Sequence, residues 1–300
     1  MAVSINSKLV VSYVGPKYRR PLNDSQLEVL RLLYKFRFST SELVARYLGK
    51  TNVKLVQKKL KVLEDQGYIG KRYDKSYKLQ GKPAAYYLTP KGARLLRQLY
   101  QQFKNSGNKD KPFIVISDQG IKQLYKNRTV SEDFIAHCLN ILNIYLKLRE
   151  LYGDCCKFFT RVELTIYYYF PTWLPDAYFA LKPSSNSKAS PKRYFLDIWD
   201  GTRPFFVSVR KARNYLKYSE EGDWPTDRSA FPAILMICDT KKNETKLRRQ
   251  IVKALDESYE KVTYATTTQE TFITANEPKD RIWRLVDDQD TFLALDKLNQ

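Results

Sequence analysis

The chain has 300 residues, of which 52 are Lys or Arg and 32 are Asp or Glu, so its formal net charge is +20. This length allows a large buried core and is typical of two domains. The charge is uneven: residues 1–130 hold 27 basic and 8 acidic residues, a net +19, whereas residues 131–300 hold 25 and 24, a net +1. A front half this basic favours a polyanionic partner, because phosphates that bind it release their counterions.

The cysteines and the apolar runs exclude several other classes. Cys138, Cys155, Cys156 and Cys238 include no CxxC pair, which argues against a structural zinc site and favours free thiols in a reducing compartment. No run approaches the roughly 20 apolar residues of a membrane span, and the early apolar residues are too few for a signal peptide. We therefore expect a cytoplasmic protein with no membrane partner.

Two helix-start signals open the basic half. Ser25 with Glu28, and Ser39 with Glu42, each fit a capping box, in which a hydroxyl and a carboxylate three residues later satisfy the first free backbone N–H groups. The apolar residues that follow them predict a first helix that ends near Phe36 and a short second helix.

The stretch Thr51 to Gly67 (TNVKLVQKKLKVLEDQG) predicts a third helix, which Thr51 caps and Gly67 ends. Its apolar stripe consists of Val53, Val56, Leu60 and Leu63. Its opposite face carries Asn52, Lys54, Gln57, Lys58 and Lys61. Such a face suits a DNA major groove, because amines meet phosphates and amides pair with base edges. An ordinary solvated amphipathic helix is the alternative interpretation.

Two strand-like runs, 68–73 and 84–88, flank a basic segment, and Thr89-Pro90 then begins a helix to about Phe103. Three helices followed by a two-stranded hairpin with a basic tip are typical of a winged helix-turn-helix, whose third helix enters the major groove. The residues expected to contact duplex DNA are Thr51, Asn52, Lys54, Gln57, Lys58, Lys61, Lys71, Arg72, Lys75, Lys78 and Lys82. A winged helix used only to dock a protein is the alternative.

These patterns predict four segments: a basic arm (1–22), the winged helix domain (23–104), a linker (105–130) and an α/β domain (131–300). The last begins with a long helix over 131–151 that carries the single histidine, His137, for which a packed or hydrogen-bonded structural role is expected. Strands are predicted over 158–169, 173–181, 194–199, 233–238 and 262–267, helices over 204–218 and 243–259, and a last strand or helix over 283–298. The chain is therefore expected to be a multidomain α+β protein whose second domain has a mixed sheet.

Two carboxylates interrupt apolar strands of this second domain. Asp176 lies in TWLPDAYFAL and Asp197 in YFLDIWDG, on strands expected to be adjacent, so their side chains could share one site that Glu163 on the preceding strand could join. Paired carboxylates hold Mg²⁺ or Mn²⁺, and such a metal can activate water against a phosphodiester.

The arrangement resembles the PD-(D/E)xK nuclease fold, with Pro175-Asp176 in one strand and Asp197 in the next. Trp199 stands where that pattern has a lysine, and Lys211 from the following helix could replace it. Two interpretations stay open. One is a metal-dependent DNA endonuclease with Glu163, Asp176, Asp197 and Lys211 as catalytic residues and Mg²⁺ or Mn²⁺ on Asp176 and Asp197. The other, which we favour, is a nuclease-derived scaffold without activity.

The whole resembles the replication-relaxation family of plasmid and integrative-element proteins over about residues 25–240. The features that carry the resemblance are YYLTPKG (86–92), His137, LPDAYFAL (174–181), YFLDIWDGTRP (194–204) and KARNYLKY (211–218). Trp199 and Gly201 depart from the family's pattern. The resemblance implies DNA binding in plasmid replication or mobilisation, as an accessory factor at an origin.

Several other functions are excluded or left as alternatives. One histidine cannot form the metal cluster of a usual relaxase, the run Tyr167 to Tyr169 is typical of packing in an apolar strand, and no GxxxxGK[ST] loop for nucleotide hydrolysis is present. A transcriptional regulator whose C-terminal domain dimerises or senses a ligand remains an alternative. The expected partners are double-stranded DNA, a relaxase or replication initiator, and a second copy of the chain.

Overall fold

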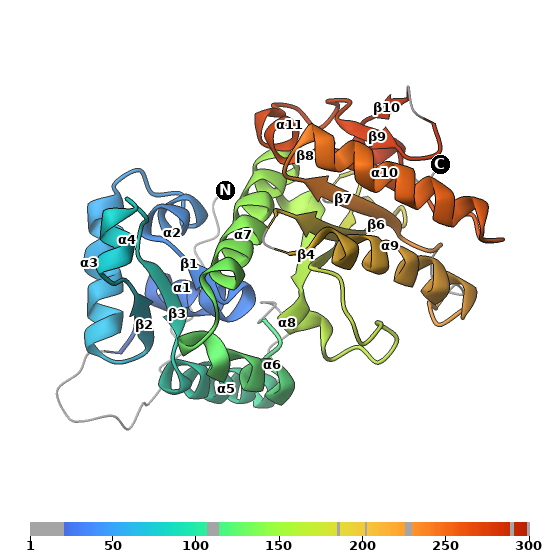
Figure 1. Ribbon diagram of the computed structural model, residues 1–300. Coiled ribbons are helices and arrows are strands. Elements are labelled where there is room, and N and C mark those ends of the chain that lie inside the picture. Colours follow the sequence, from blue (N-terminus) through green and yellow to red (C-terminus); the bar gives the residue numbers. More distant parts are fainter. Residues whose placement is uncertain are drawn as a thin grey trace.

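The structure is a computed structural model that describes residues 21–106, 114–184, 187–201, 203–225, 230–288 and 291–298 (Figure 1). The predicted basic arm, 1–22, therefore lies outside the described residues except for its last two. Within the described residues, no helix combines the length and the apolar composition that crossing a lipid bilayer requires.

The N-terminal part packs five helices around a small sheet. The helices are α1 (Asp24–Phe36), α2 (Ser41–Tyr47), α3 (Val53–Asp65), α4 (Lys75–Leu79) and α5 (Pro90–Asn105). The strands β1 (Phe38–Ser39), β2 (Ile69–Arg72) and β3 (Ala85–Leu88) form an antiparallel sheet in the order β1-β3-β2. The prediction of a two-stranded hairpin is therefore incomplete. Strand β1 adds a third strand to the sheet, and the short helix α4 lies at the tip of the hairpin. A strand of two residues leaves no periodicity in the sequence to detect.

The first three helices begin one or two residues away from the predicted caps. The observed caps are Asn23 instead of Ser25, Thr40 instead of Ser39, and Asn52 instead of Thr51. A cap needs extended backbone angles as well as a side-chain acceptor. Because adjacent residues all offer such acceptors, the sequence could not decide which one takes the extended conformation.

The core decides which face of α3 is exposed. Val56, Leu60 and Leu63 are buried, and Val53 is half-buried. Full burial of one such side chain contributes about 1.5–3 kcal/mol, which exceeds the few tenths that helix propensity contributes per residue. The apolar stripe therefore fixes the orientation of α3 and turns its basic face to solvent.

Residues 114–130 contain a helix, α6 (Asp118–Leu124), and a 3₁₀ turn, η1 (Tyr125–Arg128). Ile116, Ile121 and Leu124 are buried in the main core, and Asn127 is buried as well. This part of the segment expected to be a linker thus packs into the fold instead of spanning solvent. Residues 107–113 lie outside the described residues.

The C-terminal part is built on a mixed seven-stranded sheet in the order β10-β9-β8-β7-β6-β5-β4. The strands are β4 (Cys156–Thr160), β5 (Ala177–Leu181), β6 (Lys192–Trp199), β7 (Ala233–Cys238), β8 (Tyr264–Thr268), β9 (Trp283–Leu285) and β10 (Phe292–Leu293). The three central strands β6, β7 and β8 are parallel and the other pairings antiparallel. The helices and strands predicted for this part occur in the predicted order, but two short helices, Arg161–Leu164 and Gln269–Thr274, were not predicted. The protein is α+β.

Helices cover both faces of this sheet (Figure 1). They are α7 (Glu132–Tyr152), α8 (Arg161–Leu164), α9 (Phe205–Glu220), α10 (Lys241–Asp256) and α11 (Gln269–Thr274), with the 3₁₀ turns η2 (Gly153–Cys155) and η3 (Leu295–Lys297). Alternate residues of β6 separate the faces: Leu196 and Ile198 join the core that contains α7, and Phe195 and Trp199 join the core that contains α9 and α10. Because the first of these cores also includes α1 and α3, the two parts of the chain share one continuous interior.

Two predicted strands have the wrong boundaries. β4 ends at Thr160, and the helix α8 follows because Glu163 and Thr160 form a capping box. Glu163 therefore lies on a helix, and Tyr167 to Tyr169 lie in the turns that follow it. Tyr168 is 98% exposed, which excludes the packing role predicted for it. β5 begins at Ala177 instead of Trp173, so Asp176 stands immediately before the strand.

Candidate functional site

The outer face of α3 presents the predicted polar residues to solvent. Lys54, Gln57, Lys58 and Lys61 are exposed, as are Thr51 and Asn52 at the start of the helix. Lys61 pairs with Asp65 one turn later, at 2.8 Å. Asn52 Oδ1 accepts a hydrogen bond from the Leu55 amide, at 3.3 Å, so this carbonyl serves the helix end. Lys54 and Lys58 are consequently the cations on this face with the fewest competing contacts in the described structure.

The predicted cations of the hairpin divide into two groups. Lys75, Lys78 and Lys82 are exposed on or just after α4. Lys71 lies 3.5 Å from Glu64, and the Arg72 guanidinium pairs with Glu132 at 2.7 Å and donates to the carbonyl of Arg128 at 2.9 Å. Arg72 thus ties the hairpin to the start of α7, whereas the lysines around α4 point to solvent.

The buried site of the C-terminal part begins with Asp176 and Asp197. The pairing of Ala177 with Leu196 places them side by side at one end of β5 and β6. The Asp176 amide donates to Asp197 Oδ1 at 3.0 Å, and the Ile198 amide donates to Asp176 Oδ2 at 3.1 Å. The structure therefore brings these two carboxylates together, with 1% and 3% of their surfaces exposed.

Helix α9 supplies the cation between them. Lys211 Nζ lies 3.3 Å from Asp176 Oδ1 and also contacts Asp197 Oδ1. Tyr215, one turn further along the same face, donates its hydroxyl to Asp197 Oδ2 at 2.6 Å. Each oxygen of Asp197 thus accepts at least one hydrogen bond from α9.

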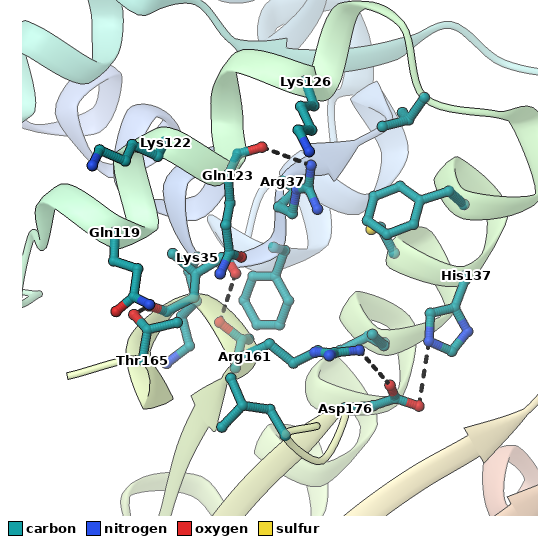
Figure 2. Close-up of a pocket in the computed structure, with 18 of the residues that line it drawn as sticks. Lys35, Arg37, Gln119, Lys122, Gln123, Lys126, His137, Arg161, Thr165 and Asp176 are labelled. Carbon is teal, nitrogen blue, oxygen red and sulfur yellow. Dashed lines mark hydrogen bonds and ion pairs between the residues drawn. The ribbon is translucent and has the colours of Figure 1, made fainter. Parts of the chain in front are cut away.

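Helix α7 supplies a second cation from the opposite face of the sheet. His137 Nδ1 lies 2.7 Å from Asp200 Oδ2, and its Nε2 lies 3.3 Å from Asp176 Oδ2. Two arginines complete the surroundings of Asp176, with Arg203 Nη1 at 3.6 Å and Arg161 Nη1 at 3.9 Å from Oδ1. Figure 2 shows His137 and Arg161 approaching Asp176 from different sides. We call Asp176, Asp197, Asp200, His137 and Lys211 the charge cluster.

Charge and burial shift the pKa values of the cluster in opposite directions. Burial raises the pKa of Asp176, but the nearby ammonium of Lys211 and the ring of His137 outweigh burial and hold that pKa well below its usual value. Burial lowers the pKa of His137, but the Asp176 and Asp200 carboxylates outweigh it and raise that pKa to about 9. Burial and the charge of Asp176 raise the pKa of Asp197, against the opposing effect of Lys211. At neutral pH His137 is therefore an imidazolium between two carboxylates.

The donor set of the cluster does not fit a catalytic Mg²⁺ or Mn²⁺. Such ions need several free oxygen ligands and a local excess of negative charge. Here the carboxylate oxygens of Asp176 and Asp197 already accept from Lys211, Tyr215 and backbone amides. Within the described residues, no three His, Cys, Asp or Glu side chains are grouped so as to hold a metal ion. The ammonium of Lys211 occupies the space between the two carboxylates.

The sequence located part of this cluster. Asp176, Asp197 and Lys211 come together, whereas Glu163 does not join them: its carboxylate accepts from the Thr160 amide at 2.9 Å and pairs with Lys35 at 3.3 Å. His137 is hydrogen-bonded and buried, as predicted, but its position inside the cluster was missed. Asp200 and Tyr215 were missed too, although Tyr215 follows Lys211 by four residues and so shares its face of α9.

A family model for replication-relaxation proteins matches residues 30–234, which is more than half of the chain. The chain belongs to the replication-relaxation family. The matched segment begins in α1 and ends in β7, so it includes α3 and the whole charge cluster. Membership of this family suggests a role in replication or mobilisation. Comparisons with curated proteins and with solved structures give no match.

Removing the ammonium of Lys211 tests how far the cluster holds the fold together. Lys211→Met leaves two carboxylates buried without their shared cation, and breaking a buried pair in this way costs about 3–5 kcal/mol. We expect the free energy of unfolding, measured by urea denaturation, to fall by about that amount. Lys217→Met on the same helix, where 73% of the side chain is exposed, is the control and is expected to change it by less than about 0.5 kcal/mol. Equal effects of the two substitutions would contradict this account.

The single histidine of the chain permits a direct titration. Because its folded pKa of about 9 exceeds the unfolded value of about 6.5, protonated His137 stabilises the fold fully below about pH 6.5, and this contribution is lost as the pH rises through 9. An NMR titration of the ring Cε1–H, on protein without a histidine tag, should have its midpoint near pH 9. A midpoint below pH 7 would show that the ring does not lie between two carboxylates.

Proposed function

We propose that this replication-relaxation protein is a DNA-binding accessory factor of plasmid or mobile-element replication or mobilisation. Residues 23–104 act as a winged helix-turn-helix domain that binds duplex DNA through α3. The observation that carries the proposal is the exposed Lys and Gln face of α3 opposite its buried stripe, in the half of the chain that holds nearly all the excess positive charge. A relaxase, a replication initiator or a second copy of the chain is the proposed protein partner.

The dimensions of α3 suit this role. Its 13 residues extend for about 20 Å along the helix axis, and an α-helix, about 10–12 Å in diameter with its side chains, fits a major groove about 12 Å wide. Lys54 and Lys58 would contact phosphates, and the amide of Gln57 would reach base edges. The lysines around α4 would lie along the backbone or the minor groove, as the tip of a wing does. Arg72 takes a smaller part than the sequence predicts, because Glu132 already pairs with it.

For residues 131–300 we propose a PD-(D/E)xK-like scaffold without catalysis, connected to the first domain through residues 105–130. The order of β4, β5, β6, α9 and β7 and the adjacency of Asp176 and Asp197 support the likeness. The saturated carboxylates support the absence of activity. In this proposal the charge cluster fixes α7 and α9 against the sheet.

One observation favours a second candidate, a metal-dependent endonuclease. Lys211 reaches Asp176 and Asp197 from α9, which is the position expected of a lysine that replaces the one missing at Trp199. A metal ion would first have to displace this ammonium from Asp197, so the geometry supports the scaffold better.

Charge reversal on α3 tests the DNA-binding proposal. Changing Lys54, Lys58 and Lys61 to Glu should abolish a gel shift with origin DNA, because the removed amines neutralise phosphates. The slope of log K against log salt should decrease by about 3, at about 0.9 for each lost phosphate contact.

The matched control changes three exposed lysines of the second domain, Lys217, Lys242 and Lys253, to Glu and alters the net charge equally. It should leave the shift nearly intact. Equal losses in both variants would mean that net charge, and not α3, drives binding. If footprinting shows protection only at the promoter of the protein's own operon, and none at the origin, the transcriptional regulator would be favoured instead.

A plasmid-nicking assay separates the two proposals for the second domain. We expect no relaxation of supercoiled plasmid by the wild-type protein with Mg²⁺ or Mn²⁺, while a nicking endonuclease run in parallel confirms the substrate. Metal-dependent nicking that Asp197→Asn abolishes would establish the endonuclease and overturn the scaffold.

A further inference from the structure

A cleft of about 660 Å³ separates the end of α1 and the α6–η1 segment from α7, α8 and the residues before β5 (Figure 2). His137 and Asp176 of the charge cluster lie at its floor, and the rest of its lining lies outside that cluster. The cleft is also distinct from the outer face of α3, so a ligand bound in it would not depend on α3 binding DNA.

Positive charge dominates the lining. Six Lys or Arg side chains line the cleft against one acid, Asp176. Lys122 and Lys126 are exposed on α6 and η1, and neither forms an ion pair within the described part of the chain. In Figure 2, Lys126 extends toward the guanidinium of Arg37, and Arg161 extends toward Asp176. Like charges turned toward one space repel one another unless an anion enters between them.

Arg37 is a half-buried cation of the cleft whose charge no carboxylate compensates among the described residues. Its guanidinium donates to Asn127 Oδ1 at 2.9 and 2.6 Å and to the carbonyl of Gln123 at 3.0 Å, and it lies 4.4 Å from the centre of the Phe134 ring. All of these groups are neutral, and no carboxylate pairs with Arg37 among the described residues. Burial, together with the like charge of Arg161, lowers the pKa of Arg37. Neutral groups hold this side chain in place and leave its charge for a ligand.

The backbone is strained at the same cleft. Among the described residues, two that are not glycine have a positive φ: Arg37 at 68° and Leu174 at 38°. Both line the cleft. A non-glycine residue in this region is costly and persists only where the surroundings impose it, and such residues cluster at active sites, ligand clamps and switch regions. At Arg37 the strain coincides with the uncompensated charge.

Shape and apolar lining define the class of ligand. The volume lies within the range of small-molecule sites, about 300–1,000 Å³, and is too small for a DNA duplex. Phe36, Val130, Ile141 and Leu174 also line the cleft and provide an apolar wall. A suitable ligand therefore has both an anionic and an apolar part. We propose that the cleft binds one phosphorylated nucleoside, with its phosphate between Arg37, Lys126 and Arg161 and its base against the apolar wall.

The nucleoside phosphate has two sources, a free nucleotide or an unpaired nucleotide of a DNA strand. The test measures fluorescence anisotropy with two probes: deoxyadenosine diphosphate carrying a methylanthraniloyl group, and a labelled single-stranded pentanucleotide with a 5′ phosphate. The pentanucleotide is added to the variant in which Lys54, Lys58 and Lys61 are Glu, so that α3 does not contribute.

The decisive variant is Lys122→Gln with Lys126→Gln, because both side chains are exposed and the fold does not need them. We expect it to weaken binding about tenfold or more, since it removes the charge-assisted contact of Lys126 and the additional positive charge of Lys122 at the same side of the cleft. Lys242→Gln with Lys253→Gln on α10 removes equal charge away from the cleft and should change binding less than about twofold. If either probe binds, and the Lys122/Lys126 variant weakens that binding more than the Lys242/Lys253 variant does, the proposal is supported. The probe that binds then identifies whether the nucleoside phosphate comes from a free nucleotide or from a DNA strand. Binding of neither probe, or equal weakening by both double variants, overturns it.

Discussion

The ammonium of Lys211 between the carboxylates of Asp176 and Asp197 is the interaction on which the C-terminal part of the fold depends. Taking each of these ions out of water costs several kcal/mol, and only close pairing with full hydrogen bonding offsets that cost. The pairing is close here because α9 presents Lys211 and Tyr215 on one face. In addition, the backbone amides of Asp176 and Ile198 donate hydrogen bonds to the carboxylates of Asp197 and Asp176. The relative positions of β5, β6 and α9 are therefore mutually constrained.

Helix α7 extends this constraint to the N-terminal part of the chain. One part of α7 places His137 between Asp176 and Asp200, and the same helix packs against α1, α2 and β1. The Arg72–Glu132 pair and the shared core add further connections between the hairpin and α7. We infer that the cleft keeps its shape because α7 packs against both of the parts of the chain between which the cleft lies.

Much of the fold could be predicted from the sequence, because periodicity and capping are local signals. The run 233–238 coincides with β7, and Thr89-Pro90 marks the start of α5. β1 and α8 were missed because elements of two and four residues carry no periodicity of their own. Because α8 was predicted as part of a strand, Glu163 was wrongly placed near Asp176 and Asp197. The sequence alone does not distinguish a glutamate that caps a helix from a glutamate in a strand.

The site was predictable only where neighbouring strands determine it. Asp176 and Asp197 were placed together because consecutive antiparallel strands bring their ends together. His137 and Asp200 are 63 residues apart, and no local pattern relates a position on α7 to the end of β6. The cleft depends on tertiary packing in the same way, because its cations come from the end of α1 and the residue after it, from α6, η1 and α8, and from the segment between β6 and α9.

If the protein's own donors saturate the carboxylates of the charge cluster, these carboxylates have no capacity left for a divalent ion. Electron paramagnetic resonance of added Mn²⁺ measures that capacity, because it counts the bound ion without requiring any reaction. We expect the wild-type protein to hold no Mn²⁺ with a dissociation constant below about 1 mM, the weak end of protein carboxylate sites, and we expect Asp176→Asn to change nothing. One tightly bound Mn²⁺ per chain that Asp176→Asn removes would contradict this expectation.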